Sequence, residues 1–118
     1  MPLSDYDKEK AYRETYELLL LTYRRVKNIA PDVMGKSLGE LKQLLSKVLS
    51  SIYQMNVCFN KSEQVKRAKH DIENVKKQFD MLHNTKSIDD ELYADVMNRA
   101  KSISSELDDI LKTTSNKT

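Results

Sequence analysis

The sequence predicts an all-α protein that folds as an antiparallel, up-down-up-down four-helix bundle. Only two glycines and two prolines occur among 118 residues, which favours helices over β-turns. Hydrophobic residues make up 39% and charged residues 32%, a balance typical of small bundles whose helices each expose one face to water. Four runs of apolar residues repeat at spacings of three and four, the period of an amphipathic helix. We expect a single domain over residues 1–118, with one core and no metal or disulfide staple.

The first helix is predicted over residues 8–30. The residues expected to face the core follow 4-3-4-3-4 spacing: Tyr12, Tyr16, Leu19, Tyr23, Val26 and Ala30. Pro31 is expected to mark the end of this helix, because the residue before a proline is pushed out of α geometry.

The second and third helices are predicted over residues 37–60 and 62–84. Ser37 with Glu40 resembles a capping box, and Ser62 is the expected N-cap of the third helix. The link between them is short, so they should be antiparallel neighbours. The expected core residues of the second helix are Leu38, Leu41, Leu45, Val48, Ile52, Met55 and Phe59. Those of the third helix are Val65, Ala68, Ile72, Val75, Phe79 and Leu82.

The fourth helix is predicted over residues 87–112, followed by a frayed tail at 113–118. Ser87 begins the sequence "SIDD", a capping pattern that places Asp89 and Asp90 in the first turn, where the helix dipole favours negative charge. Its expected core residues are Tyr93, Val96, Ala100, Ile103, Leu107 and Ile110.

The first two helices carry more apolar residues than a single core stripe uses. If Tyr16, Leu19 and Tyr23 face the core, several leucines nearby fall outside the stripe. We predict that these residues form a subunit interface of a homo-oligomer: Leu18, Leu20, Leu21, Leu44, Leu49 and Tyr53. The alternative is that a small bundle uses broad core faces.

We expect no catalytic, metal or cofactor site, and therefore no enzyme. A di-iron bundle would place glutamates and histidines at core positions of facing helices, whereas the expected core positions here hold apolar residues and tyrosine. The pairs His70 with Glu73 and Asp80 with His83 are interpreted as surface residues. The single cysteine, Cys58, excludes an internal disulfide and is interpreted as a small buried side chain.

A cytoplasmic protein without membrane contact is expected. The first five residues already include a charge and no apolar segment follows, and the longest uninterrupted aliphatic stretch is residues 18–21. Neither a signal peptide nor a transmembrane helix has this character.

Positive charge is concentrated in the first three helices. From Ser87 onward seven acidic residues stand against four cations, a net charge of −3, so residues 1–86 carry +5. Cations away from the expected core can contact phosphates as point charges, or can equally belong to an ordinary solvated face. The candidates for nucleic-acid binding are Arg24, Arg25, Lys27, Lys66, Arg67, Lys69, Lys76 and Lys77. With no aromatic residue expected among them on the surface, backbone contact is the predicted mode.

Four segments resemble a known family in order and length: "YELLLLTYRRVK", "GKSLGELKQLLSKVLSSIYQMN", "VKRAKHDIENVKKQFDMLHN" and "SIDDELYADVMNRAKSISSELDDIL". The family is that of the bacterial four-helix-bundle proteins, which groups accessory variability determinant proteins of diversity-generating retroelements with 23S rRNA intervening-sequence proteins. The likeness spans about residues 12–111. The Tyr- and Leu-rich opening, the Gly-Leu entry to the second helix, Asn56 and Ala68 are closer to the accessory variability branch.

The resemblance implies a barrel-shaped homopentamer whose basic surface binds a partner reverse transcriptase and its template RNA. Members of that branch are not enzymes themselves, but help the polymerase copy a template repeat with adenine-directed errors. Two alternatives remain open: a protein of the intervening-sequence type, and a protein-interaction adaptor that binds no nucleic acid.

Overall fold

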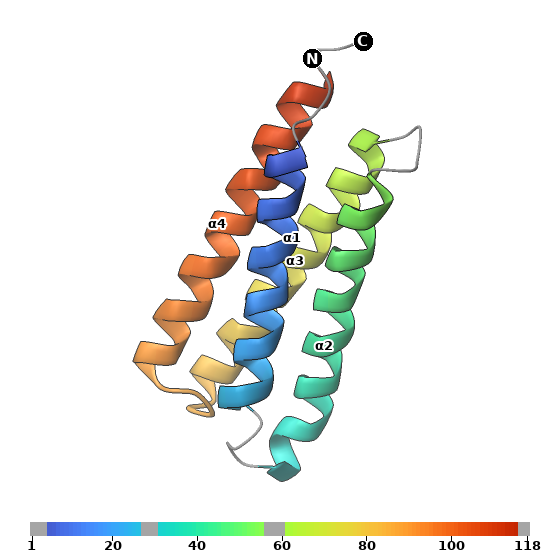
Figure 1. Ribbon diagram of the computed structural model, residues 1–118. Coiled ribbons are helices and arrows are strands. Elements are labelled where there is room, and N and C mark those ends of the chain that lie inside the picture. Colours follow the sequence, from blue (N-terminus) through green and yellow to red (C-terminus); the bar gives the residue numbers. More distant parts are fainter. Residues whose placement is uncertain (1–4, 27–30, 56–60, 116–118) are drawn as a thin grey trace.

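The computed structural model describes residues 5–26, 31–55 and 61–115, and it confirms the predicted all-α four-helix fold (Figure 1). The elements in chain order are α1 (Asp5–Leu21), a π-helical turn η1 (Thr22–Val26), α2 (Pro31–Gln54), α3 (Lys61–Asn84) and α4 (Asp90–Ser115). Successive helices run in alternate directions, so α1 begins and α4 ends at the same end of the bundle (Figure 1).

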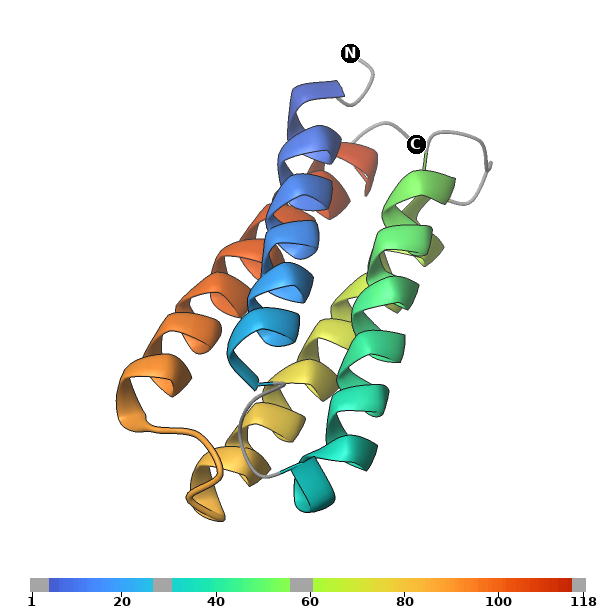
Figure 2. The ribbon, with the colours of Figure 1, turned by 60° about the horizontal axis from the view of Figure 1, so that its bottom comes forward.

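The four helices form a cyclic arrangement in which each packs against two neighbours. Among the described residues, α2 packs extensively on α3 and α3 on α4, whereas α1 closes the ring through smaller contacts with α2 and α4. Figure 2 shows the same order from a second side, with α1 between α4 and α2. No helix of the described part is both long and apolar enough to cross a membrane.

The core stripes predicted for α2, α3 and α4 are largely confirmed. Every predicted core residue of α3 is buried, as are Leu41 through Met55 of the α2 stripe and Val96 through Ile110 of the α4 stripe. The buried stripe of α4 begins with Leu92, preceded by the buried Ile88 of the turn, while Tyr93 is half-buried at its edge. Phe59 lies outside the described residues. Strict alternation of three- and four-residue spacings in aliphatic residues therefore predicted burial correctly in three helices.

The core stripe predicted for α1 is wrong by one position. The buried residues are Ala11, Thr15, Leu18 and Thr22, whereas Tyr12, Tyr16 and Tyr23 are exposed. Both threonine hydroxyls donate to the carbonyl four residues earlier in their own helix, Thr15 to Ala11 O and Thr22 to Leu18 O, each at 2.8 Å. Because these bonds satisfy the hydroxyls internally, threonine can occupy a buried position without an unpaired polar group.

The second helix begins earlier than predicted, at Pro31 rather than residue 37. Proline is well suited to the first helical position, because its fixed φ is helical and the missing N–H would have no partner there. The predicted capping box of Ser37 and Glu40 is therefore wrong, since both residues lie inside the helix. Glu40 Oε2 instead accepts a hydrogen bond of 2.7 Å from Gln78 Nε2 of α3. Ser62 is likewise inside α3, which begins at Lys61.

The turn between α3 and α4 is held by hydrogen bonds at both helix ends. Lys86 N–H donates to His83 O at 3.0 Å and Ser87 N–H to Leu82 O at 2.8 Å, which is the Schellman pattern, and Lys86 adopts a left-handed φ of 61°. The predicted Ser87 cap is wrong: Asp89 caps α4, accepting a 2.7 Å bond from Leu92 N–H. At the other end α4 continues through Ser115, three residues into the predicted tail.

Candidate nucleic-acid interface

The described cations that were predicted to bind nucleic acid are spread along the length of the bundle. Arg24 and Arg25 belong to η1, and both are exposed. Lys66 and Arg67 are exposed near the start of α3, which is at the opposite end from the end of α1 (Figure 1). Lys27 lies outside the described residues. The structure therefore does not unite the predicted residues into one patch.

Three of the predicted cations, Arg67, Lys69 and Lys76, make ion pairs within the bundle, and the Arg67 pair with Glu63 is the longest at 3.5 Å. The Lys69 ammonium pairs with the Asp108 carboxylate of α4, and Lys76 Nζ lies 3.1 Å from Glu73 Oε1 one turn earlier in α3. Lys77 is exposed on the same helix. Lys69 and Lys76 are less exposed than Arg67 and are paired with carboxylates, so they are weaker candidates for phosphate contact than Lys66 and than Arg67, whose contact with Glu63 is longer and exposed.

A groove of about 790 Å³ runs between the second half of α2 and the first half of α3, and two of the predicted cations line it. Its volume lies within the range of roughly 300–1,000 Å³ typical of small-molecule sites. Every lining side chain is polar: Lys47, Ser50, Ser51, Gln54, Ser62, Glu63, Gln64, Lys66, Arg67, His70 and Asp71. We call this feature the α2/α3 groove.

The groove opens where short side chains stand between the two helices. The bond from Gln78 to Glu40 joins the two helices and shows which of their residues lie at the same level. Two helical turns from that bond, the register brings Lys47 level with Asp71, and one further turn brings Ser51 level with Arg67. Ser51 is 8% exposed and lines the groove together with Arg67.

The charge of the α2/α3 groove is mixed. Lys47, Lys66 and Arg67 stand against Glu63 and Asp71, a net charge of +1 with His70 neutral. The contact between Arg67 Nη2 and Glu63 Oε1 is 3.5 Å long and exposed, so it holds the guanidinium only weakly. Both positive and negative groups are thus accessible to a ligand that carries acceptors and a donor.

The prediction from sequence missed the contribution of α2 to this groove. Lys47, Ser51 and Gln54 recur at spacings of four and three, one position before the buried residues Val48, Ile52 and Met55. The matching flank of α3 holds Gln64, Arg67 and Asp71. In an antiparallel helix pair, the residues one position before each core residue face each other. This spacing of polar residues in the two helices could have predicted the groove.

The bundle itself buries, fully or partly, most of the additional apolar residues that predicted a subunit interface. Leu18 belongs to the core, so its prediction as an interface residue is wrong. Leu21 and Leu44 are half-buried and pack against the core, and Leu20 and Leu49 are also half-buried. Tyr53 alone among the predicted interface residues is fully at the surface, with 63% of its area exposed.

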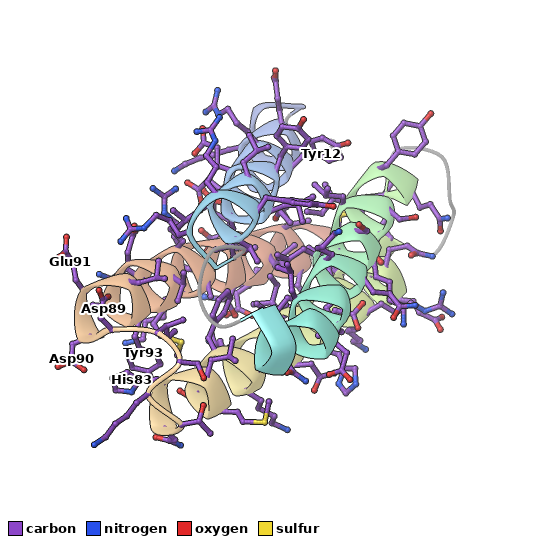
Figure 3. The ribbon with its side chains drawn as sticks, turned by 90° about the horizontal axis from the view of Figure 1, so that it is seen from below. Tyr12, His83, Asp89, Asp90, Glu91 and Tyr93 are labelled. Carbon is purple, nitrogen blue, oxygen red and sulfur yellow. The ribbon has the colours of Figure 1, made fainter. Side chains whose placement is uncertain are left out.

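The large exposed hydrophobic side chains of the first helix are tyrosines and not the leucines that the sequence predicted. Tyr12, Tyr16 and Tyr23 follow one stripe beside the core, and Figure 3 shows Tyr12 at the surface of α1. Lys42 Nζ of α2 lies 4.3 Å from the centroid of the Tyr23 ring, which places the stripe on the side of α1 nearest α2. Tyr53 of α2 is also exposed, and we refer to these four tyrosines together as the tyrosine face.

A cluster of polar side chains joins α3 to the start of α4 (Figure 3). The rings of His83 and Tyr93 stack at 4.0 Å between centroids, and His83 Nε2 lies 2.7 Å from Asp90 Oδ1. Tyr93 donates its hydroxyl hydrogen to Asp80, and this bond, with smaller effects of burial and of the Asp80 charge, raises the pKa of Tyr93. These interactions hold the last turns of α3 against the first turn of α4. Among the described residues, no three His, Cys, Asp or Glu side chains are arranged to hold a metal ion.

No model of a protein family matches the chain, and neither a curated protein nor a solved structure matches it. Fold and surface together define the class as a four-helix bundle with a polar groove of mixed charge on one side and an exposed tyrosine face on another.

Proposed function

We propose that this protein is a non-catalytic, self-associating scaffold that binds RNA through cations of its surface and holds that RNA for a partner reverse transcriptase. The partner and the pentameric state follow from the resemblance to accessory variability determinant proteins. The mode of action is positioning: cations meet phosphates, and no bond is made or broken by the protein.

The observation that carries this proposal is the place of Lys66 and Arg67. Both are exposed, and both line the α2/α3 groove together with Lys47 and the hydroxyls of three serines. Lysine, arginine and hydroxyl donors are the groups that usually contact phosphate oxygens in nucleic-acid complexes. A groove lined in this way holds a backbone by several donors at once, whereas scattered surface cations do not.

The test is a fluorescence-anisotropy titration with a labelled structured RNA at several salt concentrations. Each phosphate contact contributes about 0.7–0.9 to the slope of log K against log salt, so Lys66→Glu with Arg67→Glu should flatten the slope by about 1.5 and weaken binding at least about tenfold. Lys101→Glu with Lys112→Glu, two exposed α4 positions, changes the net charge equally and serves as the control. Absence of binding by the native protein at about 50 mM salt would refute RNA binding.

The second candidate function is a protein-interaction adaptor that binds no nucleic acid. The ion pairs of Lys69 with Asp108 and of Lys76 with Glu73 favour it, because they give part of the basic surface a structural role. Under this function, charge reversal at Lys66 and Arg67 leaves capture of the partner protein unchanged. An experiment in which a purified reverse transcriptase partner is retained by both the native and the reversed protein, with no RNA bound, would favour the adaptor.

A further inference from the structure

The α2/α3 groove contains carboxylates where a plain phosphate-binding groove would contain only donors. Glu63 and Asp71 line it beside Lys47, Lys66 and Arg67. A carboxylate beside a phosphodiester costs free energy through repulsion, unless the same ligand offers it a hydrogen-bond donor. The mixed lining therefore specifies a ligand that presents both an anion and a donor close together.

The sugar–phosphate backbone of RNA has this combination and the backbone of DNA does not. In DNA the backbone presents phosphate oxygens, ester oxygens and the ring oxygen, all of which only accept hydrogen bonds. RNA adds the 2′-hydroxyl, which donates as well as accepts and lets a protein distinguish the two polymers. A carboxylate that accepts from a ribose hydroxyl is an established way of recognising ribose in other folds.

We infer that the α2/α3 groove is a site for the ribose–phosphate backbone of RNA, in which Arg67 and Lys47 contact phosphate and Asp71 accepts a hydrogen bond from a 2′-hydroxyl. This inference rests on the proposed RNA binding and specifies the ligand of that same groove. Asp71 is the better acceptor of the two carboxylates, because Glu63 is exposed and already lies 3.5 Å from Arg67, whereas Asp71 is half-buried. DNA in the same place would leave Asp71 facing acceptors only.

The selectivity can be measured with two oligonucleotides that differ only in the 2′-hydroxyl, oligouridylate and oligodeoxyuridylate of equal length. The native protein should bind the ribose form about tenfold more tightly, the usual range for one hydrogen bond to a charged group. Asp71→Ala should bring the ratio close to one, by weakening the ribose complex and by strengthening the deoxyribose complex through the loss of repulsion. Thermal melting followed by circular dichroism checks that the variant is folded.

The matched control is Glu91→Ala, which removes one exposed carboxylate of α4 away from the groove. It should change the affinity for both oligonucleotides in parallel and leave their ratio at the native value. A native protein that binds both equally well, or an Asp71→Ala variant that keeps the native ratio, would overturn the inference while RNA binding stands. Binding of structured RNA but of neither oligonucleotide would overturn the inference alone, and failure to bind any of the three would overturn the inference and the proposed function together.

Discussion

At the scale of single residues, the turn between α3 and α4 places a lysine where glycine is usual. Lys86 follows the end of α3 in the left-handed region at φ 61°, at the Schellman position that glycine most often occupies. A side chain with a Cβ is strained there by about 1 kcal/mol, although glycine loses more entropy on folding.

We expect Lys86→Gly to raise the free energy of unfolding by about 0.5–1 kcal/mol, because the strain of the Cβ is removed. Chemical denaturation of the native and variant proteins measures the difference. Lys86→Ala is the control, since alanine retains the Cβ and should leave stability near the native value. Equal stability of the glycine and alanine variants would mean that the turn is not strained.

A second residue-scale feature is the carboxylate of Glu106 at the contact between α1 and α4. Burial raises the pKa of Glu106, and the nearby Glu14 carboxylate raises it further, while the Lys10 ammonium, 3.1 Å from one oxygen, acts in the opposite direction. A raised pKa of an acid in the folded state means that protonation stabilises the fold. The stabilisation is complete below the ordinary value of 4.5 and is lost as the pH rises through the raised value.

We therefore predict that the melting temperature of Glu106→Gln, minus that of the native protein, is larger at pH 7 than at pH 4.5. Glutamine is neutral at both values, so only the native protein loses stability as Glu106 ionises. Melting curves at the two pH values give the comparison. Glu91→Gln, at an exposed position of α4, is the control: its melting-temperature difference from the native protein should show no comparable increase from pH 4.5 to pH 7.

At the scale of elements, α1 differs from the other helices in which residues it buries. Its fully buried residues in the described part are Ala11, Thr15 and Leu18, joined by Thr22 of η1, so Leu18 is the one large side chain among them. Leu19 and Leu21 are partly buried against the core, and the tyrosines lie on the exposed flank. The contacts of α1 with α2 and α4 are smaller than those between α2 and α3.

Two alanine substitutions distinguish the observed register of α1 from the one that tyrosine spacing predicted. Leu18→Ala should lower the free energy of unfolding by about 2–5 kcal/mol, because it leaves a cavity around a fully buried position. Tyr16→Ala, at a residue 47% exposed, should cost less than about 1 kcal/mol. Denaturation at low protein concentration keeps any effect on self-association out of the comparison. If Tyr16→Ala lowered the free energy of unfolding more than Leu18→Ala, the register predicted from the tyrosine spacing would be correct.

At the scale of the whole molecule, the bundle presents chemically different surfaces around its circumference. Ion pairs such as Arg99 with Glu17 and Lys69 with Asp108 cross the contacts of α4 with its neighbours. The α2–α3 side holds the polar groove, and the α1–α2 side holds the tyrosine face. Exposed tyrosine is enriched where proteins meet one another, because the ring buries apolar area while the hydroxyl finds a partner.

We predict that the tyrosine face mediates self-association. Light scattering should give the native protein a mass several-fold above 13.7 kDa, and Tyr16→Ser with Tyr53→Ser should reduce it toward that of one subunit. Met81→Ser removes an apolar residue of α3 that is 46% exposed, outside the tyrosine face, and should leave the mass unchanged. A native protein of single-subunit mass across micromolar concentrations would contradict the prediction.

The sequence by itself determined the helical class, the number of helices and the core of α2, α3 and α4. Leucine, isoleucine and valine at helical spacing have one favourable place, away from water, so their pattern suffices. In α1 the spacing fits two adjacent stripes, and only tertiary packing decided that Thr15 and Thr22, with hydroxyls bonded within the helix, are buried in place of the tyrosines. The α2/α3 groove also depends on packing, because Ser51 and Arg67 line the same groove only through the register between two helices, which the spacing within either helix does not specify.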